Sequence, residues 1–266
     1  MSAILCVCLW LPIAVSCASA PSIEKPQFTP WYYTFTVLLE PDMPAESPRL
    51  ELALSLLHME YPAAQADYFH QLLYSGGNFT KYKDQVISEQ RSIYRSAINE
   101  ESLEEETPAE LNWRRSESIV LLRSLNQGLV IERDIVNFSG GDHEIQSKRY
   151  YVLDMEELRQ IKIDDFFTDY QEQERLRDLV YEEMRKYSDL SRGQKLSEGI
   201  FFSDEPELSF NFFLSDEGLI LHWDPQQIAP YSYGDIDITV PWYAIRPMML
   251  TSGIQLLTKF NIHLFM

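Results

Sequence analysis

The chain has 266 residues, of which 45% are hydrophobic, and it contains 15 Tyr, 14 Phe and 5 Trp. This apolar content is enough for a folded core and excludes wholesale disorder. The formal net charge of −19 repels phosphate backbones, so we expect no nucleic-acid partner. The same charge either attracts a cationic partner, such as a basic protein, or serves only to keep the chain soluble.

The N-terminus predicts export. Residues 1–20 carry no charge and are mostly apolar from Ile4 to Val15, a length that suits a signal peptide and is short for a membrane span. Residues 14–17 (AVSC) resemble a relaxed lipobox that would make Cys17 a lipidated N-terminus, whereas residues 17–20 (CASA) offer an ordinary cleavage site. We favour lipidation at Cys17, which predicts a periplasmic or cell-surface protein anchored to the membrane by lipid.

Residues 21–30 are proline-rich and predict a tether, and residues 31–117 are expected to form a first α+β domain. Within it, period-2 and aromatic patterns predict strands over residues 31–40 and from Leu50 to Pro62. Helical spacing predicts helices over residues 63–74 and 81–97. The glutamate-rich stretch 99–110 is expected to be a solvated loop.

Residues 118–250 are expected to form the second domain. Strands are predicted over these segments: 118–123, 129–138, 149–153, 208–214, 219–223 and 236–240. A capping-box pattern at Thr168 and Gln171 predicts the start of an amphipathic helix, and a short helix is predicted over 242–249. The apolar tail 251–266 is too short to span a membrane and is expected to pack on the core, with partner or membrane-surface binding as the alternative.

Three motifs in this second region carry a family resemblance. They are residues 138–143 (FSGGDH), residues 163–167 (IDDFF), and residues 228–234 (IAPYSYG) followed by an alternating strand. In this order they resemble a domain of unknown function found in bacterial envelope proteins. That domain forms the extracellular part of RsiV-type anti-sigma factors, which bind lysozyme, and precedes the catalytic domain of PdaC-type peptidoglycan deacetylases. The preceding residues are similar in plan to its usual companion domain.

The resemblance implies an α+β fold of two small subdomains, each a largely antiparallel sheet packed against helices. Its enzymatic and anti-sigma activities do not carry over, because we identify neither a deacetylase domain nor a sigma-binding segment with an internal membrane span. Asp142 also stands where the family usually has alanine.

Two segments supply candidate ligand-binding residues: Gly140, Gly141, Asp142 and His143 in one, Tyr231 and Tyr233 in the other. The glycines either admit a ligand close to the backbone or simply turn the chain. Asp142 and His143 form either a base–orienter pair or a structural turn. The tyrosines of the aromatic loop, with Trp223 and Trp242 nearby in sequence, either stack on a sugar or protein partner or fill the core. His222, placed in a strand, is expected to be structural.

We find no catalytic motif, no metal-ligand spacing and no cofactor site in the sequence. The preferred hypothesis is a non-enzymatic envelope lipoprotein that binds a basic protein such as lysozyme, or a cell-wall glycan. The alternative is a cell-wall carbohydrate hydrolase or accessory enzyme that uses Asp142 and His143.

Overall fold

The computed structural model describes residues 25–42, 47–74, 77–99, 112–140, 143–170 and 173–264. Several predictions concern segments outside these ranges: the signal peptide, lipidation at Cys17, residues 21–24 of the tether, most of the acidic loop, Gly141, Asp142 and Gln171. They stay predictions. Residues 27–30, predicted as the end of the tether, are instead the start of the first strand. No described helix is long and apolar enough to cross a membrane.

A six-stranded sheet in the order β1-β2-β3-β4-β5-β6 dominates the fold. Its strands are β1 (Gln27–Leu38), β2 (Arg49–Tyr61), β3 (Trp113–Leu125), β4 (Gly128–Phe138), β5 (Ile145–Asp154) and β6 (Arg159–Ile161). Neighbouring strands are antiparallel except β2 and β3, which are parallel. A parallel pair needs a long crossover, and helices α1 (Ala63–Leu73) and α2 (Phe79–Asn99) lie within it.

The second sheet has three antiparallel strands, β7 (Phe212–Leu214), β8 (Gly218–Trp223) and β9 (Ile236–Pro241). Helices α3 (Glu174–Tyr187), α4 (Trp242–Ile245) and α5 (Thr251–Lys259) accompany it. Four 3-10 turns complete the fold: η1 (Ile163–Asp165), η2 (Leu196–Glu198), η3 (Tyr231–Tyr233) and η4 (Arg246–Met248). The predicted α+β class, with two parts that each combine a sheet and helices, is confirmed.

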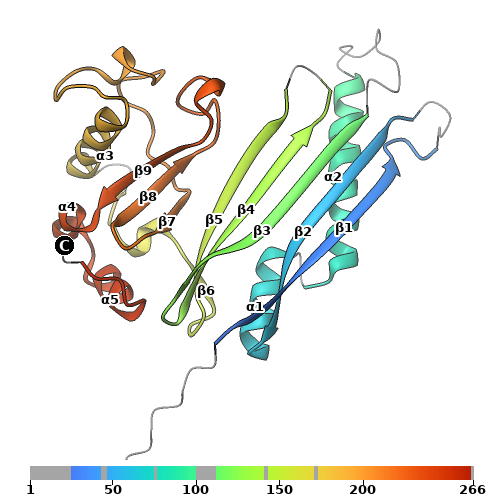
Figure 1. Cartoon of the computed structure of the whole chain (residues 1–266), viewed down its shortest axis with the longest axis horizontal. Coiled ribbons are helices and arrows are strands. Elements are labelled where there is room, and N and C mark those ends of the chain that lie inside the picture. The colour runs from blue at the N-terminus through green and yellow to red at the C-terminus, as the bar shows by residue number, and fades with distance from the viewer. Residues whose placement is uncertain are drawn as a thin grey trace, which may run out of the picture.

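Each sheet has its own hydrophobic core. Under the six-stranded sheet, Leu52, Leu54 and Leu56 of β2 pack against Phe69 and Leu73 of α1. Figure 1 shows α1 and α2 on one face of that sheet and the three-stranded part beside its β5 end. Alternation of buried and exposed residues along β2 follows from this arrangement, because only one face of the strand meets helices.

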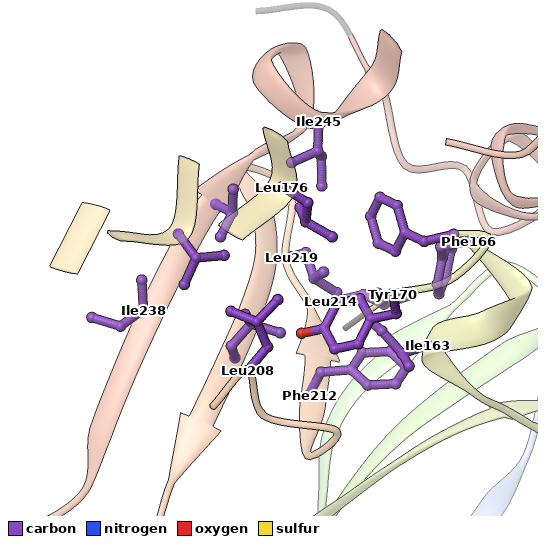
Figure 2. Close-up of a cluster of buried hydrophobic side chains, with 14 of the residues drawn as sticks. Ile163, Phe166, Tyr170, Leu176, Leu208, Phe212, Leu214, Leu219, Ile238 and Ile245 are labelled. Carbon is purple, nitrogen blue, oxygen red and sulfur yellow. The ribbon is translucent and has the colours of Figure 1, made fainter. Parts of the chain in front are cut away.

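The second core joins the segment after β6 to the three-stranded sheet. Figure 2 shows Ile163, Phe166 and Tyr170 directed toward Phe212 and its neighbours on β7 and β8. The C-terminal segment closes this core, since its apolar residues Leu256, Leu257, Phe260, Ile262 and Leu264 are buried. The prediction that the tail packs on the core is therefore confirmed, and much of it is a helix, α5, which the sequence did not indicate.

Three boundaries differ from the predictions. β3 runs through the expected domain boundary between residues 117 and 118 and pairs with β2 on one side and β4 on the other. The two sheets are therefore separated further along the chain, between β6 and β7. α3 begins at Glu174, without a side-chain cap, so the predicted start at Thr168 is wrong. The strand predicted over 208–214 shrinks to β7.

Candidate functional site

The structure brings together one pair of predicted site residues, His143 and Tyr231. Their ring centroids are 4.6 Å apart, and the Tyr231 hydroxyl donates a hydrogen bond of 3.0 Å to the backbone oxygen of Glu144. The turn before β5 and the aromatic loop therefore meet, as residues of one binding surface would. Tyr233 is exposed, and no described residue has a ring contact or hydrogen bond with its side chain.

Gly140 adopts a φ of 82°, a conformation that favours glycine, and a Cβ placed there would meet nothing within 4 Å. The turning role weighed in the sequence is thus sufficient to explain it. No described carboxylate is hydrogen-bonded to His143, and Asp142 lies outside the described residues. The hydrolase hypothesis therefore gains no catalytic pair from the part of the chain that the structure describes.

A charged cluster centred on a buried histidine lies close by, where the two sheets meet. We call it the His222 cluster; it consists of His222, Asp224, Asp235, Asp237 and Lys148. His222 Nδ1 lies 2.7 Å from Asp237 Oδ1, and its Nε2 lies 3.2 Å from Asp224 Oδ1. The imidazole itself is fully buried, which confirms the structural role expected for this histidine.

The electrostatics of the cluster favour a charged imidazole. Burial alone lowers the pKa of His222, but the hydrogen bonds and charges of Asp224 and Asp237 outweigh it and raise the pKa to about 9. Burial raises the pKa of Asp224, yet its bonds from His222 and from the Lys148 amide bring it below the ordinary value. At neutral pH the cluster thus contains an imidazolium held between carboxylates.

Lys148 connects this cluster to β5. Its ammonium forms an ion pair with Asp235, and its backbone amide donates to Asp224 Oδ1 at 2.7 Å. His222, Asp224 and Asp235 also place ligand atoms within 4.8 Å of one another, a spacing that a metal ion could bridge. Both imidazole nitrogens already face carboxylates, and Lys148 pairs with one oxygen of Asp235, whereas Asp235 Oδ1 is buried without a hydrogen-bond partner among the described residues.

The same junction seals the free edge of β5 with side chains. Asn211 accepts a hydrogen bond from the amide of Tyr150 at 2.9 Å and donates one to the oxygen of Lys148 at 2.8 Å. Its carboxamide thus replaces the backbone of a neighbouring strand. Together with the Asp224 and Tyr231 contacts, it satisfies edge groups that would otherwise be open to pairing.

Among the described residues, the side of the six-stranded sheet opposite α1 and α2 is covered only at its β5 end, where Tyr150 packs against Phe213 and His222. We call the uncovered part, along β1 to β4, the open face. It presents large apolar side chains to solvent, since Tyr32 is 73% exposed, Leu122 45% and Val120 39%. Exposed apolar groups gathered on one surface mark interaction sites.

Two adjoining grooves run across the open face, with volumes of about 380 and 440 Å³. They share Thr34, Ala53, Ser116 and Val136, and short side chains along the middle strands leave the space. Acidic residues also line them: Asp134 the first groove, Glu51 and Glu144 the second. Because Tyr231 donates a hydrogen bond to the backbone of Glu144, which lines the second groove, the His143–Tyr231 pair stands at the rim of that groove.

Sequence reasoning missed most of this surface. The alternation of Asp235 and Asp237 with apolar residues predicted the strand β9, but a strand pattern does not reveal which side chains from β5 and β8 will face those carboxylates. The open face gave no signal either, since short serine and alanine side chains in β2 and β3 are compatible with a covered face as well as an uncovered one.

Comparisons with known proteins agree on one family. Residues 164–243 match the model of a protein family of unknown function, DUF3298, and no curated protein matches the chain. A crystal structure of a DUF3298 family member from Bacteroides fragilis superposes with a TM-score of 0.68 at 20% identity, covering 86% of this chain and 95% of that one. A DUF3298 family protein from Pseudomonas aeruginosa gives a TM-score of 0.56 at 13% identity, covering 86% and 97%.

These matches support the coarser part of the resemblance found in the sequence. The finer assignment to the RsiV and PdaC types, and the identity of the first part as their companion domain, stay predictions. Residues 164–243, which contain β7, β8 and β9, are similar to the DUF3298 family model, and the chain shares its fold with two solved members of that family.

Proposed function

We propose that the chain is a non-enzymatic binding module of the bacterial envelope, which binds a basic protein of the lysozyme class on its open face. The observation that carries the proposal is the pair of adjoining grooves on an uncovered sheet face. A fully covered sheet would offer no such surface, and a sheet face that only meets water would be expected to carry polar side chains instead of Tyr32, Val120 and Leu122.

Charge selects the partner. Arg114 and Arg115 also line the second groove. Arg114 pairs with Glu144 at 3.4 Å and Arg115 pairs with the buried Glu117 at 3.2 Å, so Glu51 and Asp134 leave the grooves acidic. The chain as a whole carries a net charge of −19. A basic protein is steered toward such a surface and meets complementary charge there, whereas an acidic partner is repelled.

The place of action follows from the same proposal. The apolar N-terminal residues and Cys17 suit export and lipid anchoring, and an anchored acidic module would face basic proteins that reach the envelope. The hydrolase alternative stays a hypothesis, because no contact of His143 among the described residues favours it.

Binding to lysozyme and to isolated peptidoglycan tests the proposal, with the full chain immobilised in detergent. We expect retention of lysozyme, and weaker retention as salt is raised, because exposed charges are screened over roughly 8 Å at physiological ionic strength. Failure to retain lysozyme contradicts the basic-protein proposal. Retention of peptidoglycan alone would identify a glycan-binding module instead.

A matched pair of variants locates the binding surface. Ser116→Arg fills the shared part of both grooves and adds positive charge there, so we expect lysozyme binding to weaken about tenfold or more. Ser96→Arg makes the same change on the exposed side of α2, across the sheet, and should leave binding unchanged. Equal effects of the two substitutions would remove the open face from the proposal.

A further inference from the structure

The outer edge of the six-stranded sheet, β1, carries backbone groups that no described residue satisfies. The Leu39 amide donates a hydrogen bond to the backbone oxygen of Pro48, in the segment that leads into β2. Because successive residues of a strand direct their backbone groups to alternate sides, the odd-numbered residues of β1 are those that bond to β2. The even-numbered residues therefore direct their amides and carbonyls away from the sheet. Pro30 fits this parity, since it has no N–H and sits where no ladder bond is needed.

Both ends of this edge are closed, and the middle is free. At one end Pro30 lacks a donor. At the other, the Arg91 guanidinium donates to the oxygen of Leu38 at 2.9 and 3.1 Å. Between them, the outward backbone groups of Tyr32, Thr34 and Thr36 have no hydrogen-bond partner among the described residues. The β5 edge of the same sheet, by contrast, is sealed by Asn211, Asp224 and Tyr231.

We propose that a second copy of this chain pairs with β1 in antiparallel fashion, with the two-fold axis at Thr34. In this register Thr34 faces Thr34 of the second copy, and Tyr32 faces Thr36 of the second copy, twice by symmetry. Each facing pair exchanges two backbone hydrogen bonds, so the free stretch of each copy satisfies the free stretch of the other.

The side chains of β1 suit this self-pairing. The facing pairs are threonine with threonine, tyrosine with threonine, and, on the helix side, Tyr33 with Phe35 of the second copy. Threonine pairs, aromatic with β-branched pairs and aromatic pairs are the combinations that stabilise neighbouring antiparallel strands. The strand thus complements itself about its own centre.

Charge permits the contact. Residues 27–38 contain no charged side chain, so pairing brings no like charges face to face, and the lysines that commonly protect edge strands are absent from β1. The net charge of −19 on each copy repels the other copy at longer range. Added salt screens that repulsion, so self-association should strengthen with salt, whereas binding of a basic protein should weaken.

Pairing would extend the open face across two copies. Tyr32, Thr34 and Thr36 line the two grooves, and their counterparts from the second copy would continue the same face without interruption. The grooves of both copies would then adjoin at β1. This inference does not depend on the proposed ligand, because it concerns the chain alone.

Sedimentation equilibrium of the full chain in density-matched detergent tests the proposal without any ligand. We expect a dimer with a dissociation constant on the order of 10–100 µM, as for a small interface, and tighter association at higher salt. A chain that remains monomeric at about 300 µM, well above that range, overturns the proposal.

Thr34→Pro is the decisive variant, because it removes an outward amide that the monomer does not use. It should weaken the dimer about tenfold or more, while Thr34→Val, which keeps the amide, should leave it unchanged. Urea unfolding of both variants reports whether the monomer remains folded. A dimer equally strong in the proline and valine variants contradicts pairing through β1.

A second substitution guards against misfolding of the proline variant. Thr34→Lys keeps the backbone amide but places two like charges opposite each other at the axis, which destabilises a strand pair. It should dissociate the dimer, and a dimer that survives this change also overturns the proposal.

Discussion

Two charge clusters, each centred on a buried group, have opposite designs. In the first, Glu117 of β3 is fully buried and accepts hydrogen bonds from Arg133 at 2.9 Å, from Arg115 at 3.2 Å and from the Tyr82 hydroxyl. This Glu117 cluster is held between one sheet and α2, with one acid for two guanidinium groups. The His222 cluster instead joins two sheets, and there the carboxylates outnumber the cations.

The buried charges of the Glu117 cluster stabilise one part of the fold, whereas those of the His222 cluster connect the two sheets. The Glu117 cluster lies inside the first core, so its loss affects the body of the six-stranded sheet. The His222 cluster ties β8 and β9 to β5 and borders the open face, so its loss should first affect how the two parts are held together.

The largest expected effect belongs to Glu117→Ala. Removal of the carboxylate leaves Arg115 and Arg133 buried without their acid, and breaking a buried pair in this way costs about 3–5 kcal/mol. Urea unfolding of the variant measures it, with Tyr82→Phe as a milder control that removes one hydroxyl. A loss below about 1 kcal/mol, the size of an exposed ion pair, would contradict the role given to this cluster.

His222→Gln should cost less, about 2–3 kcal/mol, because it removes a hydrogen-bonded cation from two carboxylates that are only partly buried. The effect should be uneven across the molecule. Hydrogen exchange at the amides of Lys148 and Tyr150 should accelerate more than exchange in β2. If exchange rises equally in β5 and β2, the His222 cluster does not specifically hold the two sheets together.

The pH dependence of stability should separate the two clusters. The pKa of His222 is raised from an ordinary value of 6.5 to about 9, so the folded state keeps a proton that the unfolded state loses between these values. The stabilisation by His222 is then complete below pH 6.5 and is lost as pH rises to about 9.

This dependence is measured as the difference in unfolding free energy between wild type and His222→Gln. We expect the difference to shrink from pH 6.5 to 9. The corresponding difference for Tyr82→Phe should stay constant, because burial raises the pKa of Tyr82 and keeps its hydroxyl protonated. A His222 difference that does not change with pH would show that the imidazole is not held as a cation.

Asn211→Ala tests the connection between the two sheets without altering the net charge. The variant loses the two bonds to the edge of β5, and we expect a cost of about 1–2 kcal/mol with faster exchange of the Tyr150 amide. Asn211→Asp keeps the acceptor for that amide but loses the donor to Lys148, so the Tyr150 amide should stay more protected than in the alanine variant. Equal exchange in the two variants would argue against edge sealing.

The smallest effect is expected for Tyr231→Phe. Its hydroxyl makes one exposed hydrogen bond, so the loss in unfolding free energy should be about 0.5 kcal/mol. Lysozyme binding is the sharper readout, since Tyr231 stands at the groove rim. A loss of stability as large as that of His222→Gln would show that Tyr231 helps to hold the two sheets together.

Local patterns predicted much of the fold. The alternating leucines of β2, the helices α1 and α2 and the alternating strand β9 follow from periodicity that a single segment contains. The start of α3 was misplaced because Thr168 and Gln171 match a capping box while the helix begins later, at Glu174. α5 was not predicted because its nine residues (TSGIQLLTK) include the helix-disfavouring Gly253 and three β-branched residues, so its composition did not indicate a helix.

The site was predicted only in part. His143 and Tyr231 were both predicted as candidate binding residues, and the structure brings them together, but the His222 cluster and the open face depend on which strands become neighbours. Lys148 and Asp235 are 87 positions apart in sequence, and nothing local to either residue indicates the other. The two grooves exist because no described segment covers this part of the sheet, and the sequence of the groove residues does not indicate that.

Hydroxyl-radical footprinting of the chain with and without lysozyme shows whether the partner binds on the open face. Tyr32 on the open face and Tyr243 on the three-stranded part are similarly exposed, at 73% and 64%, so they form a matched pair of probes. We predict that lysozyme protects Tyr32 and Leu122 from oxidation and leaves Tyr243 unchanged. Protection of Tyr243 with continued oxidation of Tyr32 would contradict binding of the partner on the open face.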